Sequence, residues 1–300
     1  MVGTAQGGRP ARPMRVLVTG AAGQVGREVV ELLEASPRHE VLGLARAELD
    51  VADRERCLQV AGEWGPELVI NAAAFTAVDA CQSERERAWA ANAWGARNMA
   101  EAARLVGAHL VHVSTDYVFD GTSPLPYVEW DRPNPLSVYG LSKLGGEEEV
   151  RALLPGATVA RTSWVCGRYG ANMVKTVLRL AGREGPLRFV DDQRGCPTFA
   201  RDLAGMLVLL GTSRQPGTFH VTNQGTTTWY GFAGEVLAAA GHDPGRVEPI
   251  STAELDPPRP APRPANSVLD NAALRLAGIP LLDDYHEPLS RTVKSVLASA

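Results

Sequence analysis

Apolar positions in the first half of the chain follow two patterns, short continuous runs and helical repeats. The continuous runs have the length of buried strands, and the repeats between them place apolar residues on one side of a helix. Asp53 is suited to cap the second of these helices. We expect strands at residues 15–19, 40–45, 67–71, 109–114 and 158–161, and helices at residues 24–35, 53–64, 83–106 and 137–153.

This alternation of strand and helix predicts an α/β fold. Strands that alternate with helices form a parallel sheet with right-handed crossovers and helices on both faces. We therefore expect a Rossmann-type doubly wound parallel sheet. Ligands of such sheets bind beyond the carboxyl ends of the strands, which is where Asn71, Ser114, Thr115 and residues 162–164 fall.

The second half of the chain differs from the first in composition and pattern, and it predicts a smaller mixed α/β lobe for substrate binding. Glycine and proline become frequent after residue 165, and helical repeats return at residues 200–210, 230–240 and 290–300. The proline-rich run at 256–264 excludes a regular helix or inner strand, because proline lacks an amide donor. We expect a flexible leader at residues 1–13, a dinucleotide-binding domain at 14–165 to which some later segments return, and the substrate lobe at 166–300.

Composition and charge narrow the classes of partner. The chain is 45% hydrophobic with a formal net charge of -4, which argues against nucleic acid. No apolar run approaches the roughly 20 residues of a membrane span, and the N-terminus lacks the apolar segment of a secretory signal. The four cysteines are far apart and have no nearby histidine pair, so we expect a cytoplasmic protein with neither disulfides nor a metal site.

A glycine-rich turn follows the first predicted strand and opens the first predicted helix. Gly20, Gly23 and Gly26 have the spacing GxxGxxG. Glycine permits close approach of the backbone to a pyrophosphate, whose charge is stabilised by the amides at a helix N-terminus. The turn therefore predicts a dinucleotide site, with a plain βα turn as the alternative. The spacing differs from the GxGxxG of many NAD-dependent dehydrogenases and favours reductases of the short-chain type.

The end of the second strand predicts which dinucleotide binds. An acidic residue there would accept from the ribose 2′-hydroxyl of NAD, but this chain has Leu44, Ala45 and Arg46. Arg46 would neutralise a 2′-phosphate, so we predict NADPH, with NADH as the alternative. Asp50 and Val51 are candidates to touch the adenine; the alternative is that they lie in a loop without this role.

Tyr139 and Lys143 predict proton transfer. They lie one turn apart on the same side of a predicted helix. The ammonium would lower the pKa of the phenol, which is about 10 when unperturbed, and Tyr139 would act as general acid. Thr115, at the end of the fourth strand, is our candidate to orient a substrate carbonyl, and capping of the following loop is its alternative role. Tyr117 and Tyr127 also carry phenols but have no lysine four residues on.

Further segments complete a set of motifs that extends from Met14 to the C-terminus. They are Asn71-Ala-Ala-Ala-Phe-Thr-Ala-Val-Asp79, Ser114-Thr-Asp-Tyr-Val-Phe-Asp-Gly121, Arg161-Thr-Ser-Trp-Val165, Asp192-Gln-Arg-Gly-Cys-Pro-Thr198, Gly225-Thr-Thr-Thr-Trp229 and Arg263-Pro-Ala-Asn-Ser267. Together with the glycine turn and the pair of Tyr139 and Lys143, this set resembles the extended short-chain dehydrogenases/reductases. Within them it resembles the dTDP-4-dehydrorhamnose reductase family.

This resemblance implies reduction by NADPH of the 4-keto group of dTDP-4-dehydro-6-deoxy-L-mannose to dTDP-L-rhamnose, with Tyr139 as general acid. A dTDP-sugar is then the partner. For the oligomeric state we expect either a monomer or a homodimer, and the sequence does not choose between them. A reductase or epimerase for another nucleotide-6-deoxy-ketosugar, as in an antibiotic pathway, would share the cofactor half. The non-catalytic regulatory subunit of methionine adenosyltransferase also resembles this family and is a second alternative.

The resemblance also implies roles for individual residues. Gly23, Gln24 and Val25 would line the pyrophosphate, Ala74, Phe75 and Thr76 would border the cofactor, Val113 would lie behind it, and Lys143 would hold the nicotinamide ribose. Thr115 and Asp116 would meet the sugar, and Trp164 would contact it from the opposite wall. Arg263, in the proline-rich loop, is our candidate to clamp the diphosphate with two hydrogen bonds.

The chain departs from the family pattern at positions that concern the cofactor. It has Phe75 where the family often has histidine, and Ala45 near the position of an acid. Some members bind magnesium between subunits through glutamates that we cannot match here. Magnesium is therefore not supported by the sequence.

Overall fold

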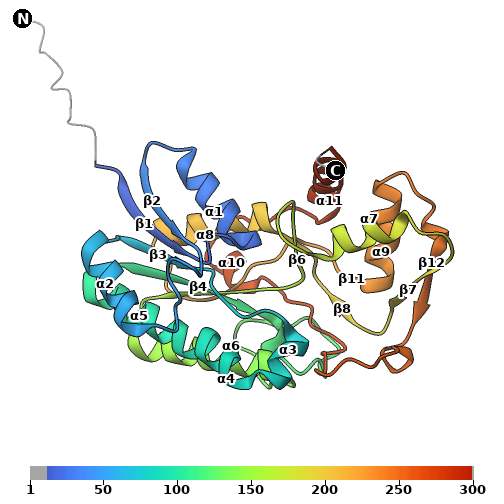
Figure 1. Ribbon diagram of the computed structural model, residues 1–300, viewed down its shortest axis with the longest axis horizontal. Helices are drawn as coiled ribbons and strands as arrows, with labels where there is room; N and C mark the ends of the chain where they lie inside the picture. Colours follow the sequence, from blue (N-terminus) through green and yellow to red (C-terminus); the bar gives the residue numbers. More distant parts are fainter. Residues whose placement is uncertain (1–11, 299–300) are drawn as a thin grey trace, which may run out of the picture.

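The computed structural model describes residues 12–298, which form a central sheet with helices on both faces and a smaller lobe at one side (Figure 1). Residues 1–11 of the predicted leader and the last two residues of the predicted C-terminal helix lie outside the described residues. The expected α/β architecture is confirmed, because every strand pair of the main sheet is parallel.

The main sheet follows the strand order β10-β5-β4-β3-β1-β2. The direction of winding reverses between β1 and β3, which is where open α/β sheets bind ligands. The register brings the strand ends together, since Thr19 pairs with Asn71 and Ser114 pairs with Arg161. The strands are β1 (Met14–Thr19), β2 (His39–Leu44), β3 (Leu68–Asn71), β4 (His109–Thr115), β5 (Thr158–Thr162) and β10 (Gly217–His220).

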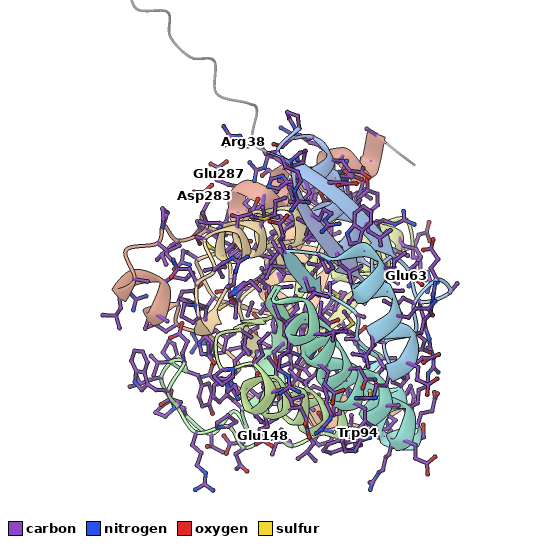
Figure 2. The ribbon with its side chains drawn as sticks, turned by 90° about the vertical axis from the view of Figure 1, so that its left-hand side faces the viewer. Arg38, Glu63, Trp94, Glu148, Asp283 and Glu287 are labelled. Atoms are coloured by element: carbon purple, nitrogen blue, oxygen red, sulfur yellow. The ribbon has the colours of Figure 1, made fainter. Side chains whose placement is uncertain are left out.

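Two apolar cores lie on the two faces of this sheet. Along β1, Leu17 belongs to one core and Val16 and Val18 to the other, because successive side chains of a strand point to opposite faces. The first face is covered by α2 (Arg54–Trp64), α5 (Gly95–Val106) and α6 (Val138–Leu153), and the second by α1 (Gln24–Glu34), α8 (Ala200–Thr212) and α10 (Ala272–Leu276). Charged side chains such as Glu63 and Glu148 point outward from the first layer (Figure 2).

The smaller lobe has a core of its own, in which Phe189, Phe232 and Val293 are buried. Short strands pair there in twos, β7 with β12, β6 with β9 and β8 with β11. The lobe contains β6 (Val165–Cys166), α7 (Met173–Ala181), β7 (Leu187–Val190), β8 (Arg194–Gly195), β9 (Thr198–Phe199), β11 (Thr227–Thr228), α9 (Trp229–Ala239), η3 (Pro244–Arg246), β12 (Val247–Ile250), η4 (Thr252–Glu254) and α11 (His286–Ala298). Strand β10 and helices α8 and α10 come from the same half of the chain but pack with the main sheet.

The prediction of one continuous helix at residues 83–106 is wrong. The structure instead has α3 (Val78–Ser83), α4 (Arg85–Trp89), the π-helix η1 (Ala90–Trp94) and then α5. In η1, the buried Asn92 donates to the carbonyl of Phe75 at 3.1 Å and to Ser142 Oγ at 2.9 Å, and it accepts from the amide of Phe75 at 2.8 Å. These tertiary hydrogen bonds stabilise the wider turn, which apolar periodicity does not encode.

A buried carboxylate fastens α6 to the sheet. Glu147 accepts from Arg161 of β5 at 2.8 and 2.9 Å and from Ser114 of β4 at 2.6 Å. Arg151, one turn further along α6, contacts it at 2.5 Å. Burial by itself would raise the pKa of Glu147, but these partners outweigh it and hold the pKa below its usual value. Helix α6 is thereby fixed over the ends of β4 and β5.

Replacing Glu147 by Gln should lower the free energy of unfolding by about 3–5 kcal/mol, because Arg161 would stay buried without a counter-charge. Denaturant unfolding at neutral pH measures this loss. Glu148→Gln, on the outer face of the same helix, is the matched control and should change stability by less than about 0.5 kcal/mol.

The pH dependence of this loss has a defined sign. The folded pKa of Glu147 is depressed, so its contribution is present above the unfolded value of 4.5 and is lost as the pH falls below it. The stability gap between wild type and Glu147→Gln should therefore narrow in acid. A gap that widens on acidification would contradict the ion pair.

Candidate functional site

Two adjoining cavities lie at the carboxyl edge of the main sheet, and every predicted site residue except Arg263 lines one of them. The larger, of about 570 Å³, is lined by Gly23, Gln24, Val25, Gly26, Ala74, Thr76, Val113, Thr115, Asp116, Tyr139, Lys143 and Trp164, among others. The smaller, of about 210 Å³, is lined by Gly20, Gly23, Arg46, Asp50, Val51, Ala74 and Phe75, among others. Because Gly23 and Ala74 line both, the cavities form one elongated candidate site.

A third cavity, of about 600 Å³, lies beside α1 and away from these strand ends. Its charged side chains neutralise one another, since Arg168 and Arg201 contact Glu28, and Arg291 contacts Asp202. The strand-end site differs, because it contains a buried oxygen, Asp116 Oδ2, that has no hydrogen-bond partner among residues 12–298. We therefore place the candidate site at the strand ends.

The glycine turn is built so that only glycine fits at two of its positions. Gly20 has a φ of +68°, and a Cβ there would lie 2.7 Å from the amide nitrogen of Ala73. A Cβ on Gly26 would lie 2.2 Å from the carbonyl oxygen of Gly20. Gly23 precedes α1 and offers no side-chain cap, so the first amides of α1 have no side-chain acceptor from that position. This arrangement fits a phosphate group at the helix N-terminus.

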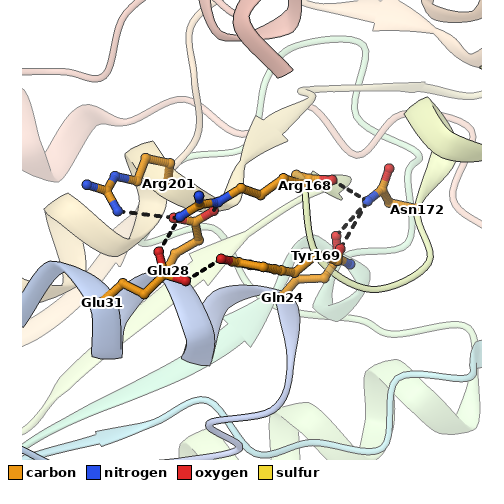
Figure 3. Close-up of polar contacts among 8 residues, drawn as sticks. Gln24, Glu28, Glu31, Arg168, Tyr169, Asn172 and Arg201 are labelled. Atoms are coloured by element: carbon orange, nitrogen blue, oxygen red, sulfur yellow. Dashed lines mark hydrogen bonds and ion pairs between the residues drawn. The ribbon is translucent and has the colours of Figure 1, made fainter. Parts of the chain in front are cut away.

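Helix α1 is tied to the loop that leads into α7 (Figure 3). Gln24 donates to the carbonyl of Ala171 at 3.3 Å and accepts from Asn172 at 3.0 Å. One turn further along α1, the buried Glu28 accepts from Arg168 at 2.9 Å. These contacts bring the loop over the glycine turn, so that Gly170 and Ala171 of the loop line the larger cavity.

Tyr139 lies in the first turn of α6, where Ser137 caps the helix by accepting from the amide of Gly140 at 3.2 Å. Tyr139 is 9% exposed and lines the larger cavity together with Thr115. Burial raises the pKa of Tyr139, because the phenolate would be poorly solvated. The side chain therefore keeps its proton at neutral pH.

Lys143 follows one turn later, but it does not act on Tyr139 as we expected. Its ammonium donates to the carbonyl of Val113 at 2.6 Å, and burial lowers the pKa of Lys143 to about 8. We expected Lys143 to lower the pKa of Tyr139, and this expectation is wrong. Burial has the largest effect on the phenol and raises its pKa.

Thr115 and Asp116 lie at the end of β4 and the start of the short turn η2 (Asp116–Val118). Thr115 donates to Asp116 Oδ1 at 2.9 Å and accepts from the amide of Tyr117 at 3.2 Å, so it caps this turn while it lines the cavity. Asp116 is 2% exposed, and burial raises its pKa to about 7. The site thus contains a carboxyl group that changes its charge near neutral pH.

Trp164 forms the wall of the larger cavity together with Trp229, which the sequence analysis did not single out as a site residue. The two indoles stack with centroids 3.5 Å apart and planes 7° from parallel. Trp164 has a φ of +46°, which is rare for a bulky residue. Gly195 makes room behind it, because a Cβ there would lie 2.4 Å from the Trp164 ring.

Arg46 and Arg263 both have carboxylate partners. Arg46 contacts Asp50 at 3.1 Å at the mouth of the smaller cavity. Arg263 donates to both oxygens of Asp79, at 2.5 and 2.8 Å, and its side chain is 13% exposed. The clamp on a diphosphate that we predicted for Arg263 stays a prediction, because the structure shows the guanidinium on this carboxylate.

The sequence analysis also missed Asn92 and His112. Asn92 orients the segment at Phe75, and His112 lies behind Lys143 with its Nε2 atom 3.5 Å from Lys143 Nζ. The position of His112 at an inward-facing site of β4 was the one available signal, and a buried histidine in a strand is more often a core residue.

No helix among the described residues is long and apolar enough to cross a membrane. Residues 12–298 also contain no group of three or more His, Cys, Asp or Glu side chains that would hold a metal ion.

Comparisons with known proteins place this site in context. A family model described as RmlD substrate binding domain matches residues 14–298. The chain is 40% identical to a dTDP-4-dehydrorhamnose reductase of Streptomyces griseus, over 95% of each protein. It is 42% identical to a probable dTDP-4,6-dihydroxy-2-methyloxan-3-one 4-ketoreductase of Streptomyces antibioticus, over 95% of this chain and 97% of that protein.

Solved structures agree with these relatives. The crystal structure of dTDP-4-dehydrorhamnose reductase from Bacillus anthracis in complex with NADP superposes with a TM-score of 0.90 at 38% identity. The match covers 94% of this chain and 99% of that one. Fold and sequence therefore point to the same group of proteins.

Replacing Gly26 by Ala should lower the free energy of unfolding by about 1–3 kcal/mol, because the new Cβ collides with the backbone of the turn. Gly62→Ala is the matched control, since a Cβ at this exposed position of α2 meets nothing within 4 Å. The control should be neutral or stabilising by up to about 1 kcal/mol. Equal effects of the two variants in thermal or denaturant unfolding would contradict the close approach in the turn.

Proposed function

The chain belongs to the dTDP-4-dehydrorhamnose reductase family, and on this basis we propose that it reduces the 4-keto group of dTDP-4-dehydro-6-deoxy-L-mannose to dTDP-L-rhamnose with NADPH. The observation that carries this proposal is the convergence of Tyr139, Lys143 and Thr115 in one cavity beside the glycine turn. A buried proton donor next to a dinucleotide-binding turn is what reduction of a carbonyl requires.

The described residues fit the cofactor that the proposal requires. The glycine turn leaves the N-terminus of α1 free of a side-chain cap, which suits the pyrophosphate. Arg46 and Asp50 line the smaller cavity at the end of β2, which suits the adenosine end and favours a 2′-phosphate through the guanidinium. Bound NADPH would supply the hydride for the keto carbon.

Tyr139 would donate the proton that completes the reduction. Its raised pKa keeps the phenol protonated in the free enzyme, and an alkoxide is a stronger base than a phenolate, so transfer to the alkoxide is favourable. Tyr139 and Thr115 line the same cavity, which supports a joint role of their hydroxyl groups at the substrate carbonyl. Thr115 would donate to the keto oxygen as negative charge builds there, if its proton turns from Asp116 to the substrate.

The remaining residues would position cofactor and sugar. Lys143 is held by the Val113 carbonyl at the floor of the cavity, where its other protons suit the nicotinamide ribose. Trp164 and Trp229 present a flat apolar wall that suits the C6 methyl side of a 6-deoxy sugar. Asp116 would bind sugar hydroxyls.

The described residues line the cavity from a single chain, which supports a site that works within a monomer as well as within a homodimer. The four cysteines are buried and free, which supports a reducing compartment, and we propose the cytoplasm.

A second candidate substrate has specific support. The relative from Streptomyces antibioticus is named as a 4-ketoreductase for a different dTDP-sugar, and its 42% identity is close to the 40% of the Streptomyces griseus reductase named for rhamnose. The shared cofactor half would serve either substrate, so the sugar itself has to be tested. The intact trio of Tyr139, Lys143 and Thr115 argues against a non-catalytic binding subunit.

The test is incubation with dTDP-4-keto-6-deoxyhexose isomers while the nicotinamide absorbance is followed. Consumption of NADPH with the L-mannose-configured ketosugar, and formation of dTDP-L-rhamnose, is the expected result. Consumption only with another isomer would move the assignment to the second candidate. Isomer interconversion without loss of NADPH would indicate an epimerase.

Tyr139→Phe should bind NADPH with little change but lose about 10²–10⁴-fold in turnover, because the proton donor is removed while the ring still fills its place. Tyr117→Phe is the matched comparison, since it removes the neighbouring phenol, 5.8 Å away between ring centroids. The Tyr117→Phe variant should lose far less turnover than Tyr139→Phe. Steady-state rates and cofactor titration measure both, and the reverse order of losses would transfer the acid role to Tyr117.

Arg46→Ala should weaken NADPH binding about 10- to 100-fold and leave NADH binding nearly unchanged, because only NADPH has the 2′-phosphate. Arg38→Ala, at the other end of β2, is the control and should weaken neither. Titration with both cofactors decides, and an unchanged ratio of the two affinities would remove Arg46 from cofactor selection.

A further inference from the structure

A chain of four buried polar side chains leads from the glycine turn to Lys143. Thr19 is the last residue of β1, Asn71 ends β3, His112 lies in β4, and Lys143 lies in α6. Their exposed fractions are 0%, 0%, 1% and 2%. Water cannot reorganise around groups buried to this extent, so each hydrogen bond constrains the next one.

The first link fixes the orientation of the Asn71 amide. Asn71 Oδ1 accepts from the hydroxyl of Thr19 at 2.7 Å and from the backbone amide of Ala73 at 3.3 Å. A backbone N–H can only donate, so the atom that faces it must be the amide oxygen. The amide nitrogen of Asn71 then points at His112 Nδ1, 3.1 Å away.

The second link fixes the tautomer of His112. An amide NH₂ can only donate, so His112 Nδ1 must be the acceptor and carries no proton. Burial and the neighbouring Lys143 hold the pKa of His112 well below its usual value, so the ring is neutral. A neutral imidazole has one proton, and it must therefore be on Nε2.

This proton points at Lys143. His112 Nε2 lies 3.5 Å from Lys143 Nζ. An ammonium has three donors and no acceptor, whereas a neutral amine has a lone pair that accepts from an N–H. We propose that His112 is a positioning residue, locked by Asn71 in the Nε2–H tautomer, which destabilises the ammonium of Lys143 and favours its neutral amine.

The other groups around Lys143 do not reverse this preference. Glu147, one turn further along α6, favours the ammonium, but its oxygens are engaged with Arg161, Arg151 and Ser114. Tyr139, one turn before, is protonated and uncharged. The carbonyl of Val113 accepts from Lys143 at 2.6 Å and also favours the ammonium, because a charged N–H is the stronger donor, but burial outweighs both groups and keeps the pKa of Lys143 below its usual value.

Burial acts in the same direction as His112, and together they would place the proton exchange of Lys143 near neutral pH.

The functional consequence rests on the proposed reductase activity. After Tyr139 has given its proton to the product alkoxide, the ammonium of Lys143 would return one proton to the phenolate. The resulting neutral amine, stabilised by His112, would then take a proton from solvent. Each step moves one proton and leaves the number of electrons unchanged.

The tautomer can be tested in the unmodified protein without any activity. Long-range ¹H–¹⁵N correlation spectra of histidine-labelled protein distinguish the two tautomers, and the chain has only six histidines. His112→Phe identifies the signal by its loss. The expected result at neutral pH is a His112 ring with its proton on Nε2. A ring with its proton on Nδ1, or a doubly protonated ring, would overturn the proposal.

The effect on Lys143 can be read directly, because the chain has only three lysines, Lys143, Lys175 and Lys294. Titration of ¹³Cε-labelled lysine signals should show a pKa for Lys143 that rises by about one unit in His112→Phe. His109→Phe is the matched control, since His109 lies in the same strand but contacts Thr158. It should leave the Lys143 titration unchanged.

These outcomes are distinct from those that test the proposed function. An unchanged Lys143 titration in folded His112→Phe would overturn the role of His112, whatever the enzyme reduces. If the Lys143 titration shifts in a protein that consumes no NADPH with any ketosugar, the result would support the role of His112 and contradict the proposed reductase activity. In an active enzyme, the alkaline limb of the turnover profile should move upward with the Lys143 titration, and not with the titration of Asp116.

Discussion

The contact on which the site depends is the buried carboxylate of Glu147, which joins α6 to two strands at once. Ser114 reaches it from β4 and Arg161 reaches it from β5. Tyr139 and Lys143 occupy the two turns of α6 before it, and Thr115 is the residue after Ser114. One carboxylate therefore sets the distance between the proton donor and the strand end where a carbonyl would bind. Burying the Glu147 carboxylate costs free energy of desolvation. Its partners offset this cost, and the carboxylate keeps its position only while all of them are present.

The elements could be predicted from sequence where a local pattern determines them. The five apolar runs became strands β1 to β5, Asp53 caps α2 through the amide of Arg56, and the glycine turn opens α1. The convergence of the strand-end residues followed from parallel topology. Nearly all predicted site residues line the two cavities for that reason.

The features that the sequence analysis missed depend on contacts between residues far apart in the chain. Such contacts cannot be inferred from a single sequence. Asn92 widens its helix because Phe75 and Ser142 lie within reach. Arg263 meets Asp79 across 184 positions of the chain. The pKa of Tyr139 was predicted in the wrong direction, because helical spacing shows that a lysine is near but does not show where its ammonium is held or how deeply the phenol is buried.

Gly195 has a consequence for how this enzyme scaffold can change. A Cβ on it would lie 2.4 Å from the Trp164 ring, although Gly195 is not among the residues that line the larger cavity. Any larger residue at this position would press the indole inward or force it from its stack with Trp229. The shape of the larger cavity can therefore change through added volume at a position that does not line it, while every residue that does line it stays the same.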